Sequence, residues 1–80
     1  MNGLRVYTNP SDADEPGGRA MFYSRRADGP FYCWFYEEQG GRWQVGRVHL
    51  PDFALRELRT ASWKAVPPEL QAKINEHYLE

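Results

Sequence analysis

The sequence predicts an α+β fold, in which an antiparallel sheet of three to four strands is followed by two C-terminal helices. The first observation is that apolar and polar side chains alternate in short runs up to residue 50, as they do in strands. The second is that Gly, Pro, Asn and Asp residues cluster between these runs, as they do in turns. Beyond residue 50 the apolar residues recur at helical spacing. Residues 1–80 are therefore expected to form a single small domain.

Four strands are expected, and they make a meander at residues 4–8, 20–25, 31–38 and 42–50. Residues 9–19, with the sequence NPSDADEPGGR, are mostly turn-forming or acidic, which predicts a flexible acidic loop. The sequence ADGP at 27–30 marks the next turn. Gly40 and Gly41, flanked by two predicted strands, indicate a β-hairpin.

Two helices are expected after the sheet. Asp52 is a suitable N-cap, and Phe53 and Leu58 lie on one side of a helix within 51–61. Pro67 and Pro68 predict the start of a second helix over 67–78, because proline is tolerated in a first helical turn.

The two faces of the predicted sheet differ in chemistry. A two-residue turn at Gly40-Gly41 pairs Phe35 with Gly46 and Cys33 with Val48, and a four-residue turn keeps the same residues on each face. One face is almost purely apolar, as a protein core usually is, and we expect it to be the buried one. Its members are Phe31, Cys33, Phe35, Val48 and Leu50, with Leu4, Val6 and Phe22 from the first two strands. The helices and the segment between them are expected to add Phe53, Leu58, Trp63, Leu70 and Ile74 to this core.

The opposite face carries rings with polar groups, together with arginine and histidine. Tyr, Trp and Arg are the residues enriched at the energetic centres of protein interfaces. We therefore expect a small, non-enzymatic protein-interaction module that binds a protein partner, or itself, through this face. The candidate partner-binding residues are Tyr32, Trp34, Tyr36, Trp43, Arg47, His49, Tyr23 and Arg25.

Two alternatives for this face remain open. In the first, the second helix or the long loop folds over Tyr32, Trp34 and Tyr36, and the face is a second core. In the second, the same rings stack on the bases of single-stranded nucleic acid. A net charge of −1 counts against that second alternative, because nucleic-acid platforms are usually basic.

The sequence shows no constellation suited to catalysis or metal binding. Cys33 is the only cysteine, and His49 points to the opposite face of the predicted hairpin, so the two do not form a nucleophile–base pair. One cysteine and two histidines match no zinc pattern. We expect no catalytic residue, no cofactor and no metal.

No membrane partner is expected either. No apolar stretch approaches the roughly 20 residues that cross a bilayer, and no secretory signal is recognisable, so a cytoplasmic location is expected. The sequence leaves open the partner, the oligomeric state, the spatial order of the strands and the face that the last helix covers. It also leaves open whether Leu79 and Glu80 are native.

Overall fold

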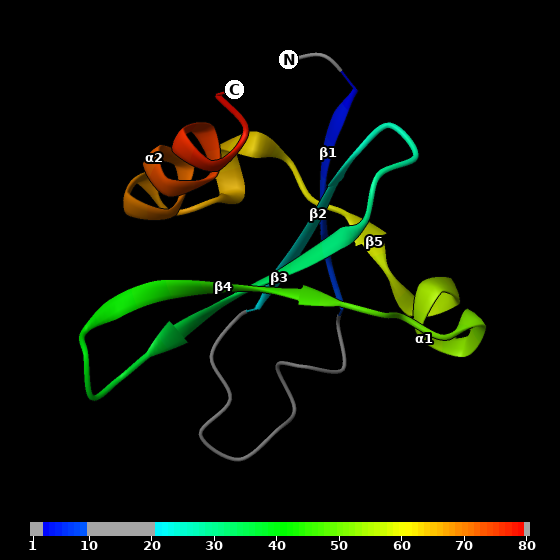
Figure 1. The fold of residues 1–80 in the computed structure, drawn as a ribbon, viewed down its shortest axis with the longest axis horizontal. Coiled ribbons are helices and arrows are strands. Elements are labelled where there is room, and N and C mark those ends of the chain that lie inside the picture. The colour runs from blue at the N-terminus through cyan, green and yellow to red at the C-terminus, as the bar shows by residue number, and fades with distance from the viewer. Residues whose placement is uncertain (1–2, 10–20, 80) are drawn as a thin grey trace.

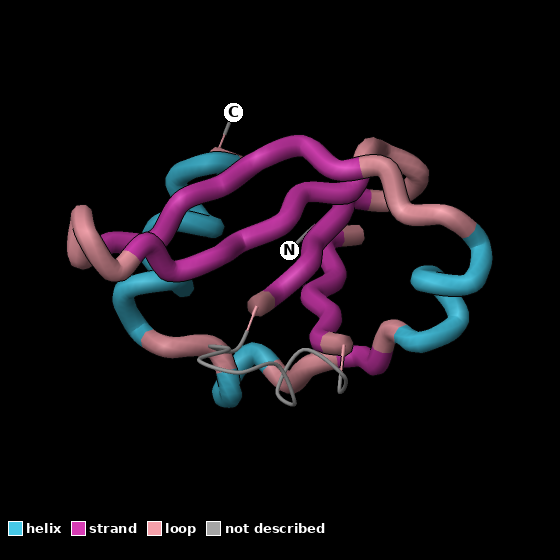
Figure 2. Tube along the Cα trace, turned by 90° about the horizontal axis from the view of Figure 1, so that it is seen from below, coloured by secondary structure: helices cyan, strands magenta, loops and turns pink. Residues whose placement is uncertain are grey.

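The structure is a computed structural model that describes residues 3–9 and 21–79. A five-stranded antiparallel sheet has the strand order β4-β3-β2-β1-β5 (Figure 1). The strands are β1 (Leu4–Thr8), β2 (Phe22–Arg26), β3 (Phe31–Glu37), β4 (Arg42–Val48) and β5 (Arg59–Thr60). The helical elements are α1 (Asp52–Glu57), a 3₁₀ turn η2 (Trp63–Ala65) and α2 (Pro68–His77). Helices α1 and α2 lie at opposite ends of the molecule (Figure 2).

The expected α+β combination of an antiparallel sheet with a C-terminal helix is confirmed, but the expected strand count is wrong, and the first of the two expected helices lies between β4 and β5 instead of after the sheet. The helix expected within 51–61 ends at Glu57, because Leu58 is already extended, with ψ of 143°. Strand β5 follows and pairs with β1, with Thr60 opposite Tyr7. The acidic loop expected at 9–19 lies outside the described residues from residue 10 onward.

The β3–β4 hairpin has a four-residue loop at 38–41 instead of the expected two-residue turn. Gly41 adopts a left-handed φ of 64°, and its N–H donates to the Glu37 carbonyl at 2.8 Å. Cys33 therefore pairs with Gly46, whereas the sequence had predicted Val48. The shift is by two residues, so the two faces of the hairpin are composed as expected.

The register between β2 and β3 corrects the assignment of the other strands to faces. Phe22 pairs with Trp34, and Tyr23 pairs with Cys33. Phe22 thus shares a face with the indole of Trp34, whereas strand alternation predicts it on the face of Phe31 and Phe35. The turn sets this register: Ala27 has φ of 49°, and the Gly29 N–H donates to the Arg26 carbonyl at 2.8 Å.

The buried face is the opposite of the one expected. The hydrophobic core joins strand residues to the segment that leads into α2 and to α2 itself. It comprises Val6, Phe22, Trp34, Trp43, Val66, Leu70 and Ile74. The Trp34 side chain is 2% exposed, whereas Phe35 on the other face is 38% exposed. The prediction that the face of Phe31 and Phe35 forms the core is therefore wrong, while the expected burial of Val6, Phe22, Leu70 and Ile74 is confirmed.

Hydrogen bonds explain why the polar rings can be buried. The Trp34 Nε1–H donates to Ser24 Oγ at 2.8 Å, and Ser24 Oγ is also 2.8 Å from the Tyr78 hydroxyl. Burying a polar group is costly only when it lacks a hydrogen-bond partner. The hydrogen bond to Ser24 therefore removes the cost of burying the indole N–H. A prediction of burial from the polarity of the rings alone does not include these hydrogen bonds.

Helix α1 contributes no buried residue. Phe53, which we expected in the core, is 64% exposed. Trp63 is partly buried and packs against the core, as expected. None of the helices in the described ranges is long and apolar enough to cross a membrane.

Candidate functional site

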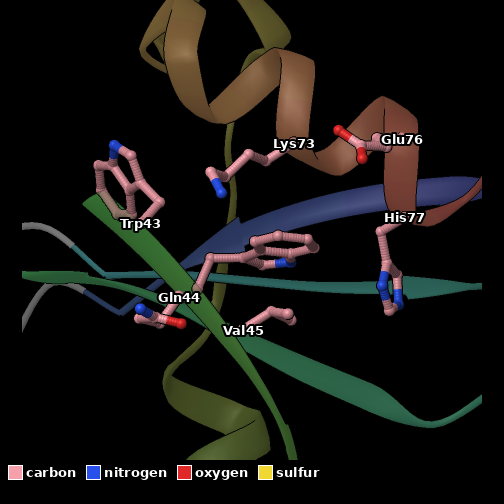
Figure 3. Close-up of a pocket in the computed structure, with 7 residues that line it drawn as sticks. Trp43, Gln44, Val45, Lys73, Glu76 and His77 are labelled. Carbon is pink, nitrogen blue, oxygen red and sulfur yellow. The ribbon is translucent and has the colours of Figure 1, made fainter. Parts of the chain in front are cut away.

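An open groove of about 500 Å³ lies between strand β4 and helix α2 (Figure 3). Trp43, Gln44 and Val45 line it from the strand, and the buried Trp34 contributes to its wall. Lys73, Glu76 and His77 line it from the helix. The groove therefore has an aromatic side formed by the sheet and a polar, charged side formed by α2.

His77 fixes one end of this groove through ring packing. Its imidazole centroid is 4.5 Å from the Tyr32 ring and 5.4 Å from the Trp34 ring, both in edge-to-face geometry. Tyr78 packs beside it at 4.8 Å. Burial raises the pKa of the Tyr78 phenol above its ordinary value, and the Ser24 hydrogen bond offsets part of this effect. This cluster anchors the end of α2 on the sheet.

Strand β4 forms the other boundary of the groove, and it is an edge strand. Within the described part of the chain, no strand pairs with its outer side. Alternate residues of an antiparallel strand direct their N–H and C=O groups away from the neighbouring strand, so β4 presents a row of such groups outward. Val45, at the middle of β4, is 40% exposed.

The two edges of the sheet differ in how they are protected. Strand β5 has only two residues, and a very short edge strand is a usual protection against pairing with another chain. Strand β4 has seven residues, contains no proline or lysine, and pairs with β3 without a bulge. Its central residues, Gln44, Val45 and Gly46, carry no charge. Apart from its two arginines, Arg42 and Arg47, this edge therefore lacks the common features that prevent strand addition.

The structure brings together five of the eight predicted partner-binding residues. Tyr32, Trp34, Tyr36, Trp43 and Arg47 share the face that α2 partly covers. Trp34 and Trp43 are only 2% and 9% exposed, so neither ring offers much surface to a partner or a nucleotide base, while Arg47 is exposed.

The other three predicted residues lie elsewhere. Tyr23 and Arg25 are on the opposite face, where the Arg25 guanidinium stacks over the Phe31 ring at 4.8 Å from its centroid. His49 is exposed, just past the end of β4. The binding role of these eight residues stays a prediction.

Sequence reasoning missed the residues of the groove other than the tryptophans. Val45 is not among the predicted contact residues. Lys73, Glu76 and His77 could not be assigned to the groove, because the sequence did not show which face α2 covers. One feature of the sequence could have indicated this site: the centre of β4, where Val45 is flanked by Gln44 and Gly46, has no charged residue and no proline.

Acidic and metal-ligating side chains are dispersed across the described residues. In 3–9 and 21–79, no three His, Cys, Asp or Glu side chains group to hold a metal ion. The Cys33 thiol lies on the face opposite the groove, with its Sγ 3.6 Å from the sulfur of Met21.

Comparison with known proteins finds no matching family model, no matching curated protein and no matching solved structure. The groove and the outer edge of β4 are therefore the features from which a function can be proposed.

Proposed function

We propose that this protein is a small, non-enzymatic interaction module that binds a protein partner, or a second copy of itself, along the outer edge of β4. The observation that carries the proposal is the seven-residue edge strand, unbulged and uncharged at its centre, beside an open groove. Proteins commonly bind an extended segment by adding it to such an edge, where backbone hydrogen bonds give affinity and side-chain pockets give specificity.

The groove supplies the specificity part of this proposal. A strand added to β4 would direct alternate side chains to the face of Trp43 and Val45, and therefore toward α2. Those side chains would meet aromatic surface on one side and the charges of Lys73 and Glu76 on the other. The proposed contact surface thus keeps Arg47 from the sequence prediction and adds Val45, while Trp34 and Trp43, which are 2% and 9% exposed, line the groove beside it.

The test compares two variants that each put a carboxylate in place of an exposed apolar side chain. Val45→Glu alters the centre of the β4 edge, and Phe53→Glu alters α1 at the other end of the molecule. Each variant and the wild type are immobilised and exposed to soluble extract of the source cells, and the retained proteins are quantified. We expect retention by the wild type and by Phe53→Glu, with loss in Val45→Glu.

Equal retention by all three proteins would contradict the proposal. Urea unfolding of the two variants provides the control for folding. Both side chains are substantially exposed, so both midpoints should stay close to the wild-type value at protein concentrations too low for self-association.

A further inference from the structure

We infer that the partner on the β4 edge is a second copy of this chain, bound through antiparallel β4–β4 pairing about a twofold axis at Val45. This inference rests on the proposed function and names its partner. It is drawn from the order of side chains along β4 and from the room around Gly46.

Geometry restricts the registers in which β4 can pair with itself. Residues directly opposite each other in an antiparallel pair point to the same face, so both copies keep their α2 helices on one side of the joined sheet. The register centred on Val45 is the one that engages the whole strand from Arg42 to Val48. It pairs Arg42 with Val48, Trp43 with Arg47, Gln44 with Gly46 and Val45 with Val45.

The groove face is complementary in this register. Each Trp43, although only 9% exposed, lies opposite the exposed Arg47 of the second copy, and an arginine beside the accessible part of an aromatic ring is a favourable cross-strand neighbour. Val45 packs against its own counterpart and loses its exposure. No two like charges are opposite each other, which is the arrangement that would oppose pairing.

Neighbouring registers lose this match. Centring the pair on Gln44 puts Trp43 opposite Val45 and leaves Arg47 beyond the end of the paired strand. Centring it on Gly46 puts Arg47 opposite Val45 and brings Trp43 beside His49, which lies outside β4. Only the central register joins the two arginine–tryptophan pairs.

On the face of β4 that points away from the groove, the proposed pairing accounts for the glycine at position 46. A Cβ placed on Gly46 would have no atom within 4 Å, so nothing in the described part of the chain requires glycine there. A glycine inside a regular strand often marks close approach by another chain or ligand. In the proposed pair, the Gln44 side chain of the second copy lies opposite Gly46 and occupies that space.

The groove leaves room for the second copy. Helix α2 packs on the Trp43 end of β4, but Val45 at the centre of the strand lies in the open groove and is 40% exposed, so the helix leaves the centre of the edge accessible. Joining two five-stranded sheets along β4 would make one continuous sheet, with the two grooves facing each other across the twofold axis.

The test uses opposite charges at the residue that meets itself. Sedimentation equilibrium should show a dimer for the wild type and for Phe53→Glu. Val45→Lys and Val45→Glu should each be monomeric, because each would oppose two like charges. An equimolar mixture of the two Val45 variants should restore a dimer that contains one copy of each.

A cross-linking measurement checks the register independently. In a Cys33→Ser background, Val45→Cys should form an intermolecular disulfide under mild oxidation, since directly opposed residues lie within disulfide reach. Gln44→Cys is the matched control. Its counterpart is two residues away along the strand, beyond the roughly 7 Å limit between Cα atoms, so it should remain uncross-linked.

Three results would overturn the inference. The first is a wild-type protein that remains monomeric at about 1 mM, the weak end of specific association. The second is a dimer that persists in both Val45 variants, since another surface would then form it. The third is a mixture that stays monomeric. A monomeric wild type whose partner retention still depends on Val45 would reject the self-pairing alone and leave the proposed function standing.

Discussion

Replacing Trp34 or Phe35 with alanine distinguishes the buried face of the sheet from the exposed one. Adjacent in β3, the two side chains point to opposite faces and are 2% and 38% exposed. Trp34→Ala should lower the free energy of unfolding by about 3–5 kcal/mol, because it leaves a large cavity beneath α2. Phe35→Ala should cost about 1 kcal/mol, since complete burial of a phenylalanine is worth only about 1.5–3 kcal/mol and Phe35 is incompletely buried.

Urea unfolding followed by circular dichroism measures both values on the same scale. A difference of about 2–4 kcal/mol corresponds to roughly 8–30 °C in melting temperature for a domain of this size. Native proteins have total stabilities of about 5–15 kcal/mol, so at the low end of this range Trp34→Ala would be close to unfolding while Phe35→Ala would remain folded. Equal losses, or a larger loss for Phe35→Ala, would refute the assignment of the core to the tryptophan face.

Two further predictions concern the hydrogen-bond chain behind Trp34. Ser24→Ala should lower the free energy of unfolding by about 1–3 kcal/mol, because it leaves the buried Trp34 Nε1–H without its acceptor. Urea unfolding measures this loss, and a loss of only about 0.3 kcal/mol would contradict the prediction. The raised pKa of Tyr78 should make the protein lose stability in alkali, since the unfolded chain ionises this phenol first. That contribution is complete below about pH 10 and declines as the pH rises through the raised pKa. Tyr78→Phe should show a shallower decline than the wild type as the pH rises above about 10, and identical slopes would argue against burial of the phenol.

Local patterns in the sequence were sufficient to predict much of the secondary structure. Alternation located strands 4–8 and 31–37, and the two prolines located the start of α2. The hairpin has a four-residue loop instead of the predicted two-residue turn, but each face carries the predicted residues. Both loop lengths are even, so the pairing shifts by two residues and every side chain keeps its face. Strand β5 was missed because its two residues are strand only through pairing with β1.

The choice of buried face depended on interactions between residues distant in sequence. Ser24 and Tyr78 are 54 residues apart, yet their hydrogen bond completes the chain that allows Trp34 to be buried. The apolar side of α2, with Leu70 and Ile74, selects the face carrying Trp34 and Phe22. No pattern within β3 alone shows which of its faces is buried. The candidate site therefore lies at the edge of the sheet, at Val45, and not at the centre of the face as the sequence predicts.

Amide hydrogen exchange in β4, followed as a function of protein concentration, tests the proposed contact most directly. Self-pairing at this edge predicts that alternate amides of Arg42–Val48, those facing away from β3, exchange more slowly as the concentration rises. The amides of β2 and β3 should keep the same rates, because their partners are already within the sheet. Concentration-independent exchange throughout β4, or new protection confined to another element, would contradict the assignment of this strand edge as the contact surface.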